Sequence, residues 1–210
     1  MMYQTENNSD RIYVSSFTLT KMTTTTKKTR RKSPPQMKVI DKFLPTSDFI
    51  AIRDIFQSED LPWYLGHGIS GSDSTNAILN PLDNYYFVHL VYFNYMITSQ
   101  HFEVVKDVIE KALKAHIGNG FNTITRIKAN LYTRTEEVQV HPFHSDTGDI
   151  DGLKGALISL NTCDGYTGFH DGTEVDSVEN RCVIFDSSKQ HHSTSTSNAQ
   201  WRLNINVNFL

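Results

Sequence analysis

The chain from residue 121 onward is divided into short runs of β-branched or alternating apolar residues, with turn residues between them. These runs are "TITRIKANLY", "GALISLN", "GYTGFHDGTEV", "RCVIFD" and "WRLNINVNFL". Such runs, bounded by Gly, Asn, Asp and Ser, are typical of β-strands. This half of the chain is therefore predicted to be all-β, and no fixed-period repeat appears in it. A sandwich or barrel of this kind has an open mouth where side chains can converge.

Two helical patterns precede these strands. Residues 47–58 carry apolar side chains at helical spacing, and Ser47 is a candidate N-cap. Residues 99–116 carry a second apolar stripe, which Gly118 or Gly120 ends. Because the helices come first and the strands follow, the sequence predicts an α+β fold, a double-stranded β-helix (jelly roll) with the N-terminal helices packed on one sheet.

The first 36 residues differ in composition from the rest. Residues 1–36 carry seven Lys or Arg and two acidic residues, whereas residues 37–210 carry thirteen Lys or Arg and twenty-one acidic residues. The Thr-rich basic segment has too few large apolar side chains to offset its ordering entropy, so we expect a disordered tail at 1–36 and one domain at 37–210. Met22 or Met37 is an alternative start of the native chain.

The composition also bears on partners and compartment. No run of about 18 apolar residues and no N-terminal apolar region occurs, so we expect a soluble cytoplasmic protein without a membrane partner. The acidic body does not favour binding to a nucleic-acid backbone, and a solvated tail is preferred over a nucleic-acid arm. Cys163 and Cys182 are expected to be buried thiols without a role.

The hexapeptide "HPFHSD" at 141–146 concentrates two imidazoles and a carboxylate. His144 and Asp146 are two residues apart, so on a strand both side chains point to the same face. His191 follows a hydrophobic strand and a turn. Two imidazoles and one carboxylate on one side of an ion, with the other positions open, form the facial triad of non-haem Fe(II) oxygenases.

The last strand supplies a cation for the same site. In "RLNINVNF", Arg202 falls on the polar face of an alternating strand and points away from the apolar core. Fe²⁺ with the Asp146 carboxylate leaves one positive charge, 2-oxoglutarate brings two negative charges, and Arg202 restores neutrality. Asn130 and Tyr132 share one face of the strand before the hexapeptide, where they can bond the co-substrate. A packed strand tyrosine is the alternative for Tyr132.

Residues 124–209 resemble the 2-oxoglutarate and Fe(II)-dependent oxygenases, especially the small prolyl-4-hydroxylase-like members of phages and marine bacteria. The resemblance rests on "FHSD", "GYTGFHDGT", "NRCVIFDSS" and "WRLNINVNF". It implies that residues 37–210 are the oxygenase domain. The site residues that it implies are His144, Asp146 and His191 for iron, Arg202 for the C5 carboxylate of 2-oxoglutarate, and Asn130 with Tyr132 for further co-substrate contacts.

The resemblance also implies an activity: a dioxygenase that hydroxylates a C–H bond, of a peptidyl residue such as proline, and releases succinate and CO2. Its cofactors are Fe(II) and 2-oxoglutarate, with ascorbate as an optional addition, and its partners are dioxygen and a peptide or small-molecule substrate in a bacterial or phage-infected cell. No separate catalytic acid or base is predicted. The alternatives are the same chemistry on a nucleobase or small molecule, and a non-catalytic cupin-like metal-binding module.

Some positions depart from the family pattern or leave a choice open. His192 replaces His191 as the ligand if the strand register slips by one residue, since alternation forbids both from facing the iron. Asn180 stands where many relatives have glycine. Asp146 is retained where halogenating relatives have a small residue, which favours hydroxylation. His141 is expected to be partly exposed.

Overall fold

Two antiparallel sheets and two helices make up the part of the chain that the structure describes. This computed structural model describes residues 37–68, 85–146 and 150–210, which belong to one compact unit, Pro34–Leu210, and the predicted tail at 1–36 lies outside them. The helices are α1 (Thr46–Phe56) and α2 (Phe102–Ile117), and a short 3-10 turn, Gly118–Gly120, follows α2. The strands are β1 (Met37–Ile40), β2 (Tyr64–His67), β3 (Tyr85–Phe93), β4 (Met96–Ile97), β5 (Ile124–Thr133), β6 (Lys154–Ser159), β7 (Tyr166–Phe169), β8 (Glu174–Asp176), β9 (Cys182–Asp186), β10 (His191–His192) and β11 (Trp201–Phe209).

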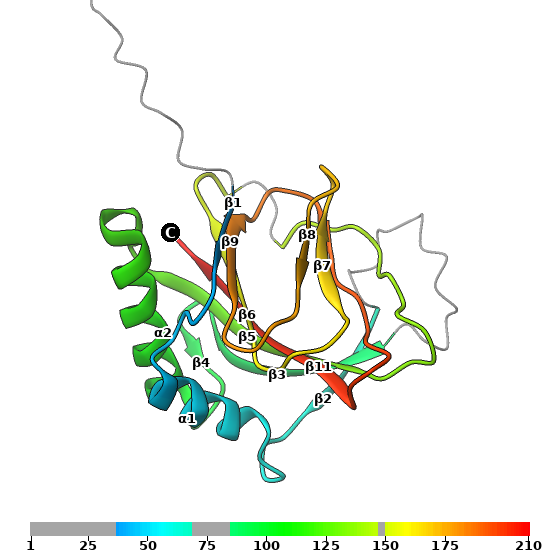
Figure 1. The fold of residues 1–210 in the computed structure, drawn as a ribbon. Helices are drawn as coiled ribbons and strands as arrows, with labels where there is room; N and C mark the ends of the chain where they lie inside the picture. Colours follow the sequence, from blue (N-terminus) through cyan, green and yellow to red (C-terminus); the bar gives the residue numbers. More distant parts are fainter. Residues whose placement is uncertain (1–36, 69–84, 147–149) are drawn as a thin grey trace, which may run out of the picture. The chain divides into compact units, whose positions relative to one another are not determined.

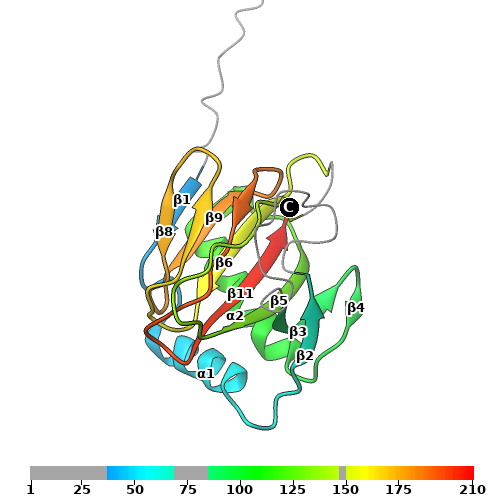
Figure 2. The same cartoon turned by 90° about the vertical axis from the view of Figure 1, so that its right-hand side faces the viewer.

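The large sheet has the order β1-β9-β6-β11-β5-β3-β2, with β4 added beside β3. The small sheet has the order β10-β7-β8. Helices α1 and α2 lie on one side of the large sheet, and β7 and β8 lie on its other side (Figure 1). Figure 2 shows β11 between β6 and β5, in agreement with the strand pairing. The described residues therefore form a mostly antiparallel jelly roll, as the strand pattern predicts.

The main core lies between the helices and the large sheet. In α2, Val105, Ile109 and Leu113 are fully buried, because a spacing of four residues keeps them on one helix face. The strand side chains of the same cluster include Ile127 of β5 and Ile205 of β11. Alternation along each strand then turns the neighbouring positions to the opposite face, which leaves that face free for polar side chains.

The last strand shows this division most fully. From residue 202 onward, its odd-numbered residues belong to the main core cluster, and its even-numbered residues are buried polar side chains. The apolar set is Leu203, Ile205, Val207 and Phe209, and the polar set is Arg202, Asn204, Asn206 and Asn208. The predicted alternation of "RLNINVNF" is confirmed.

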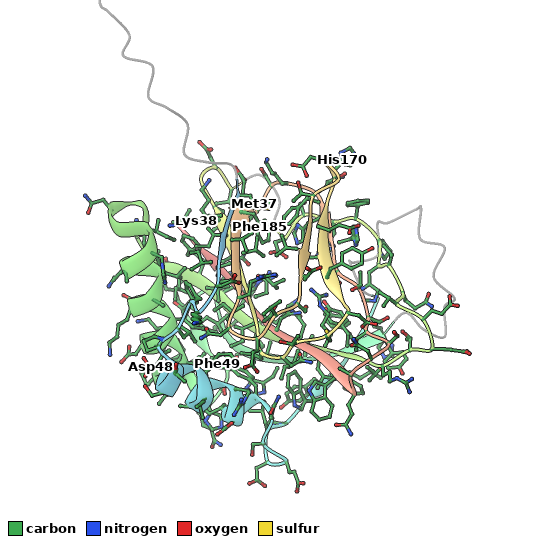
Figure 3. The ribbon with its side chains drawn as sticks, in the orientation of Figure 1. Met37, Lys38, Asp48, Phe49, His170 and Phe185 are labelled. Carbon is green, nitrogen blue, oxygen red and sulfur yellow. The ribbon has the colours of Figure 1, made fainter. Side chains whose placement is uncertain are left out.

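A smaller apolar cluster lies between the two sheets. Phe169 of β7 and Val175 of β8 pack with Val183 and Phe185 of β9. Phe185 is also the register partner of Met37 on β1, and both are labelled on the neighbouring strands in Figure 3. This cluster holds the small sheet against one part of the large sheet, so the polar face of β5 and β11 is left to the site.

The start of α1 differs from its predicted start. The helix begins at Thr46 after Pro45, and no side chain caps it, so Ser47 is not the N-cap. The entry to the helix is instead tied down by Asn180, whose amide donates to the Leu44 carbonyl oxygen at 2.8 Å and accepts from the Leu44 N–H at 2.9 Å. Asn180 has φ +60°, a left-handed conformation that glycine favours and asparagine tolerates. Asparagine is therefore accommodated at this left-handed position.

Strands also occur before residue 121, in the part of the chain that carries the helices. The aromatic run 85–93 is β3, which pairs with β5 and β2, and β1 pairs with β9. Cys163 and Cys182 are free and buried, as expected. None of the helices in the described ranges has the length and apolar character that a membrane span requires.

Candidate active site

The structure brings together the side chains of His144, Asp146 and His191. One ligand atom from each lies within 4.8 Å of the other two, and His191 Nε2 is 3.8 Å from Asp146 Oδ1. Two backbone hydrogen bonds, from His144 N to His191 O at 2.8 Å and from His191 N to His144 O at 2.9 Å, hold the two histidines side by side. The three residues are close enough for one ion to lie between them.

The hydrogen bonds of both histidines suit a metal. His191 Nδ1 lies 3.0 Å from the Lys189 carbonyl oxygen, and His144 Nδ1 lies 3.4 Å from the Pro142 carbonyl oxygen. Because a carbonyl oxygen only accepts, each Nδ1 is the N–H donor, which leaves Nε2 as the ring nitrogen that could bind an ion. Burial, together with the charge of His191, lowers the pKa of His144 to about 4, so its imidazole is neutral at pH 7.

Asp146 is held as a carboxylate by its neighbours. Its side chain is 5% exposed, accepts hydrogen bonds from Asn206 Nδ2 at 3.0 and 3.2 Å and from Asn208 Nδ2 at 3.4 Å, and lies 3.2 Å from Arg126 Nη2. Burial alone raises the pKa of this carboxyl group, but the charges of Arg126 and His191 and the Asn206 bond outweigh burial and hold the pKa at about 2. The site thus presents two imidazole rings and one anionic oxygen ligand.

Arg202 is buried without an anion beside it. The residue is 1% exposed and donates from Nε to Ser177 Oγ at 2.7 Å, from Nη1 to the Thr194 carbonyl oxygen at 3.1 Å and from Nη2 to Thr167 Oγ1 at 2.8 Å. Its guanidinium also lies 5.8 Å from the centroid of the Tyr132 ring. No carboxylate of the described residues forms an ion pair with it. A buried cation in this state favours an anionic ligand.

Asn130 and Tyr132 lie opposite the last strand, where the sequence predicts them. Tyr132 is the register partner of Arg202, and Asn130 is the partner of Asn204. Asn130 Nδ2 donates to Asn204 Oδ1 at 3.0 Å, whereas Asn130 Oδ1 and Asn204 Nδ2 are buried without a hydrogen-bond partner. These two orphaned atoms lie between Arg202 and the histidine cluster along the strand, and a bound polar ligand can satisfy them.

Tyr132 is also a packed aromatic residue. Its ring stacks on Tyr86 at 5.7 Å between centroids and lies tilted against the His141 ring at 5.0 Å. Burial raises the pKa of the Tyr132 hydroxyl to about 12, so it stays a neutral hydrogen-bonding group. Tyr132 therefore packs as an aromatic residue of the strand and also lies beside Arg202.

His192 points away from the cluster. Its ring packs against Phe143 at 4.7 Å and Tyr166 at 5.8 Å, and a Cβ at Gly168 would be 2.1 Å from its Nε2, so only glycine fits there. His192 thus packs as a buried ring against the small sheet, while His191 faces Asp146. Alternation along β10 separates the two side chains, as the sequence argument requires.

The two histidines should differ in their effect on metal binding. We expect His191→Ala to weaken Mn(II) or Fe(II) binding by at least about tenfold, because it removes a ligand nitrogen. His192→Ala is the matched control and should change affinity less than about threefold, since its ring only packs. Equilibrium titration with the metal measures both. Equal losses in the two variants would contradict the assignment.

His141 is buried rather than partly exposed, so the expectation from the sequence is wrong. It is 5% exposed, packs on Tyr132, and its Nδ1 lies 2.7 Å from Ser193 Oγ. Burial and the charges of Arg202, His192 and His144 lower its pKa to about 3. The proline that follows His141 does not indicate this burial, because the residues that cover His141 come from other segments of the chain.

This burial has a consequence for stability at low pH. Unfolded His141 has a pKa near about 6.5, so below that pH the unfolded chain binds a proton that the folded chain does not accept until about pH 3. Stability should therefore fall with pH, with this residue contributing a loss of about 2 kcal/mol at pH 5. In urea unfolding from pH 7 to pH 5, His141→Gln should lose less stability than the wild type. The exposed His67→Gln should keep the wild-type slope, and equal slopes in all three proteins would contradict the prediction.

Two cations of β5 lie in the site and were not singled out from the sequence. In "TRIKANLY", every second position is polar: Arg126, Lys128, Asn130 and Tyr132. These four residues therefore share one face of the strand. Burial, followed by the charge of Arg126, lowers the pKa of Lys128 to about 8. The same period-two pattern that marks Asn130 and Tyr132 could have identified both.

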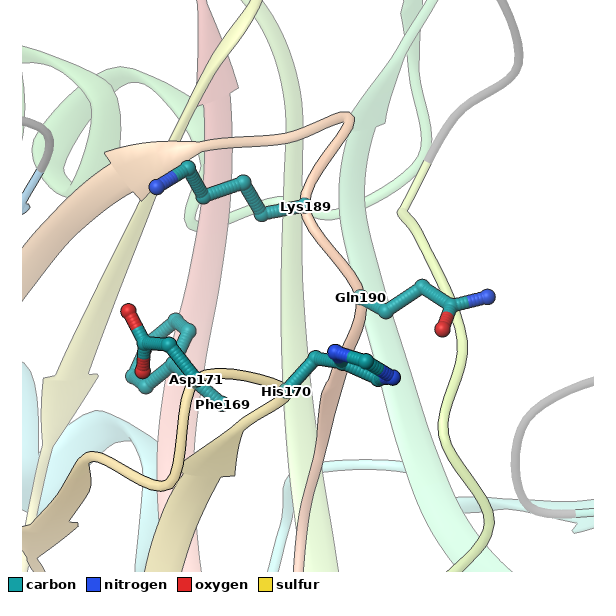
Figure 4. A pocket seen from close by; sticks show the side chains of 5 residues that line it. All are labelled: Phe169, His170, Asp171, Lys189 and Gln190. Carbon is teal, nitrogen blue, oxygen red and sulfur yellow. The ribbon is translucent and has the colours of Figure 1, made fainter.

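A cavity of about 310 Å³ opens at the rim beside the cluster. It is lined by Phe169, His170, Asp171, Lys189 and Gln190, from the tip of β7 and the loop before β10 (Figure 4). The Phe169 ring lies 6.1 Å from the His191 ring, so the cavity adjoins the candidate metal site. Its mixed lining can receive part of a larger molecule.

Comparison with known sequences finds no relative: no protein-family model and no curated protein matches the chain. Solved structures do match. A 2OG-Fe(II) oxygenase family oxidoreductase from Burkholderia pseudomallei has a TM-score of 0.63 and 11% identity, with 83% of this chain and 84% of that chain covered.

Two further structures match in the same way. A prolyl hydroxylase from Trichoplax adhaerens, in complex with a hypoxia inducible factor peptide fragment, has a TM-score of 0.54 and 16% identity, with 83% of each chain covered. HygX from Streptomyces hygroscopicus, with nickel and 2-oxoglutarate bound, has a TM-score of 0.54 and 12% identity, covering 83% and 82%. The chain therefore has the fold of the 2-oxoglutarate/Fe(II) oxygenases, prolyl hydroxylases among them, which is the family that its sequence motifs resemble.

Proposed function

We propose that this protein is a 2-oxoglutarate- and Fe(II)-dependent dioxygenase that hydroxylates a C–H bond. The observation that carries the proposal is the meeting of two imidazoles and one carboxylate beside the polar strand face that also carries a buried, anion-free arginine. A metal-binding module alone has no use for that arginine. The proposal therefore ranks above a cupin-like module that binds a metal without turnover.

His144, Asp146 and His191 would hold the iron. Nitrogen and carboxylate oxygen ligands on one side of the ion, with the remaining positions open, suit Fe(II). When bound, iron and 2-oxoglutarate supply the oxidising chemistry, in which dioxygen is activated and 2-oxoglutarate leaves as succinate and CO2. Asn206 and Asn208 orient the carboxylate through the hydrogen bonds that they donate to Asp146.

Arg202 would bind the C5 carboxylate of 2-oxoglutarate. Its planar guanidinium can reach a carboxylate with two parallel bonds, and its present partners are neutral oxygens that hold it in place. Asn130 and Tyr132 would add contacts from the facing strand, and the orphaned Asn204 Nδ2 offers a further donor. These residues fix the co-substrate and keep water from its charged end.

The substrate proposed is a peptidyl residue such as proline. Support comes from the fold, which is shared with a prolyl hydroxylase that was solved with a peptide fragment, and from the open cavity at the rim. The alternative is the same chemistry on a nucleobase or small molecule. Comparing substrate-stimulated succinate release with a proline-rich peptide and with methylated single-stranded DNA separates the two.

The activity test is succinate formation by the purified full chain. We expect release of succinate that requires both Fe(II) and 2-oxoglutarate, with ascorbate added to keep the iron ferrous. Even without the substrate, slow uncoupled turnover should be measurable and should disappear in His144→Ala. Succinate formation that continues without added metal, or at an unchanged rate in His144→Ala, refutes the proposal.

A further inference from the structure

Two cationic side chains of β5 reach the metal side of the polar strand face. Arg126 is the register partner of Asn208, and Lys128 is the partner of Asn206. Those two asparagines are the residues that donate to Asp146. Arg126 and Lys128 therefore flank the candidate metal ligand, and the proposed co-substrate contacts lie further along the same strand.

Neither cation is fully satisfied within the described residues. Arg126 lies 3.2 Å from the Asp146 carboxylate through Nη2, but its Nε and Nη2 are buried and form no hydrogen bond of good geometry. Lys128 has no hydrogen bond and no ion pair there, and its ammonium lies 5.6 Å from the centroid of the Tyr86 ring. The buried Arg126 donors without partners are costly, and together with the unpaired Lys128 ammonium they favour a ligand that accepts from them.

The charge balance of the site leads to the same conclusion. With Fe²⁺, the Asp146 carboxylate, 2-oxoglutarate and Arg202, the charges sum to zero. Arg126 and Lys128 then add two positive charges, and no other acidic residue of the described chain pairs with either. An excess of this size on partly buried side chains attracts an anion.

The co-substrate cannot supply that anion. Lys128 and Tyr132 are four residues apart on β5, a backbone distance of roughly 13 Å, and Tyr132 is the partner of Arg202. If 2-oxoglutarate extends from the metal to Arg202, its distal carboxylate points away from Lys128. The two cations of β5 are therefore left for a second molecule.

We propose that Arg126 and Lys128 bind an oxyanion group, a carboxylate or a phosphate, that the primary substrate carries close to the oxidised carbon. This inference rests on the proposed function, because it needs Arg202 to take the co-substrate. It narrows the substrate class to molecules or peptides with an acidic group at the reaction site. The depth of the two cations favours a terminal or side-chain group over a polymer backbone.

The test uses the full chain loaded with Mn(II) and saturating N-oxalylglycine, an unreactive analogue of 2-oxoglutarate. Acetate and inorganic phosphate are titrated in separate calorimetry experiments, with neutral acetamide as the matched control. We expect saturable binding of at least one anion and none of acetamide. The stronger of the two anions identifies the carboxylate or the phosphate as the group recognised.

Variants assign the binding to the cation pair. Lys128→Met should weaken the binding of the anion by about tenfold, and Lys128→Arg should keep the affinity within about threefold of the wild type. Lys154→Met, which removes a half-exposed lysine paired with Asp186, should change nothing. Affinity for N-oxalylglycine should stay within about threefold in all three variants, since Arg202 is intact.

Two results would overturn the inference: no saturable anion binding to the loaded wild type, or equal anion affinity in Lys128→Met and the wild type. Failure of Mn(II) and N-oxalylglycine to bind at all would instead count against the proposed function. In that case the same variants are compared by phosphate titration of the metal-free protein. Loss of phosphate affinity in Lys128→Met would still support the pair as an oxyanion site, and no loss would overturn it.

Discussion

Asp146→Ala is expected to abolish Fe(II)-dependent succinate formation, with a loss of at least about 100-fold. Asp146 is the carboxylate of the candidate triad, and without it two neutral imidazoles hold a dication weakly. In the wild type the Arg126 guanidinium lies 3.2 Å from the Asp146 carboxylate, and the variant removes this anion. The free energy of unfolding of the metal-free protein should therefore fall by about 3 kcal/mol.

Asp146→Asn separates the two effects. It keeps the shape of the side chain and an oxygen that can accept from Asn206, but it removes the charge that pairs with the metal. Asp186→Ala, a change at a half-exposed carboxylate on β9, is the control for general loss of an acidic residue. Metal titration, succinate assay and urea unfolding are measured on all three. Turnover near the wild-type rate in Asp146→Ala would remove Asp146 from the site.

Arg202→Met is expected to weaken the binding of 2-oxoglutarate by at least about 100-fold, while the affinity for the metal stays within about threefold. A buried bidentate charge pair is lost, whereas the three metal ligands remain. Folding should be affected little: three hydrogen bonds of about 1 kcal/mol each are lost, but a buried cation without an anion is also removed.

Arg202→Lys is the matched variant, because it keeps the charge but not the planar fork. We expect it to recover part of the co-substrate affinity. Calorimetric titration of N-oxalylglycine into the Mn(II) protein measures all three affinities. A purely structural role for Arg202 would show the opposite pattern, a large loss of stability with unchanged affinity for the analogue.

Local patterns in the sequence were sufficient for several parts of the fold. Period-two alternation places Arg202 and Leu203 on opposite faces of β11, and the structure agrees because that strand has a core on one side and a polar site on the other. The spacing of His144 and Asp146 likewise held, although their segment forms an isolated bridge with His191 rather than a regular strand. Steric and periodic rules act over a few residues, so one sequence is enough to apply them.

Other features depend on pairings between distant segments. The aromatic run of β3 gives no clear period, and its place in the large sheet is fixed by β5 and β2. His141 is buried because Tyr132 and Ser193 surround it, and neither lies near it in sequence. His191, rather than His192, lies beside His144 because backbone hydrogen bonds join the two residues across 47 positions of the chain. Single-sequence periodicity carries no information about such contacts.

The most direct test of the metal site is a crystal structure of the full chain grown or soaked without oxygen, with Fe(II) and N-oxalylglycine. We expect one ion at about 2 to 2.2 Å from His144 Nε2, His191 Nε2 and an Asp146 oxygen, with the distal carboxylate of the analogue bonded to Arg202. An ion bound elsewhere, His192 in place of His191, or an analogue that does not reach Arg202 would contradict the proposed enzyme.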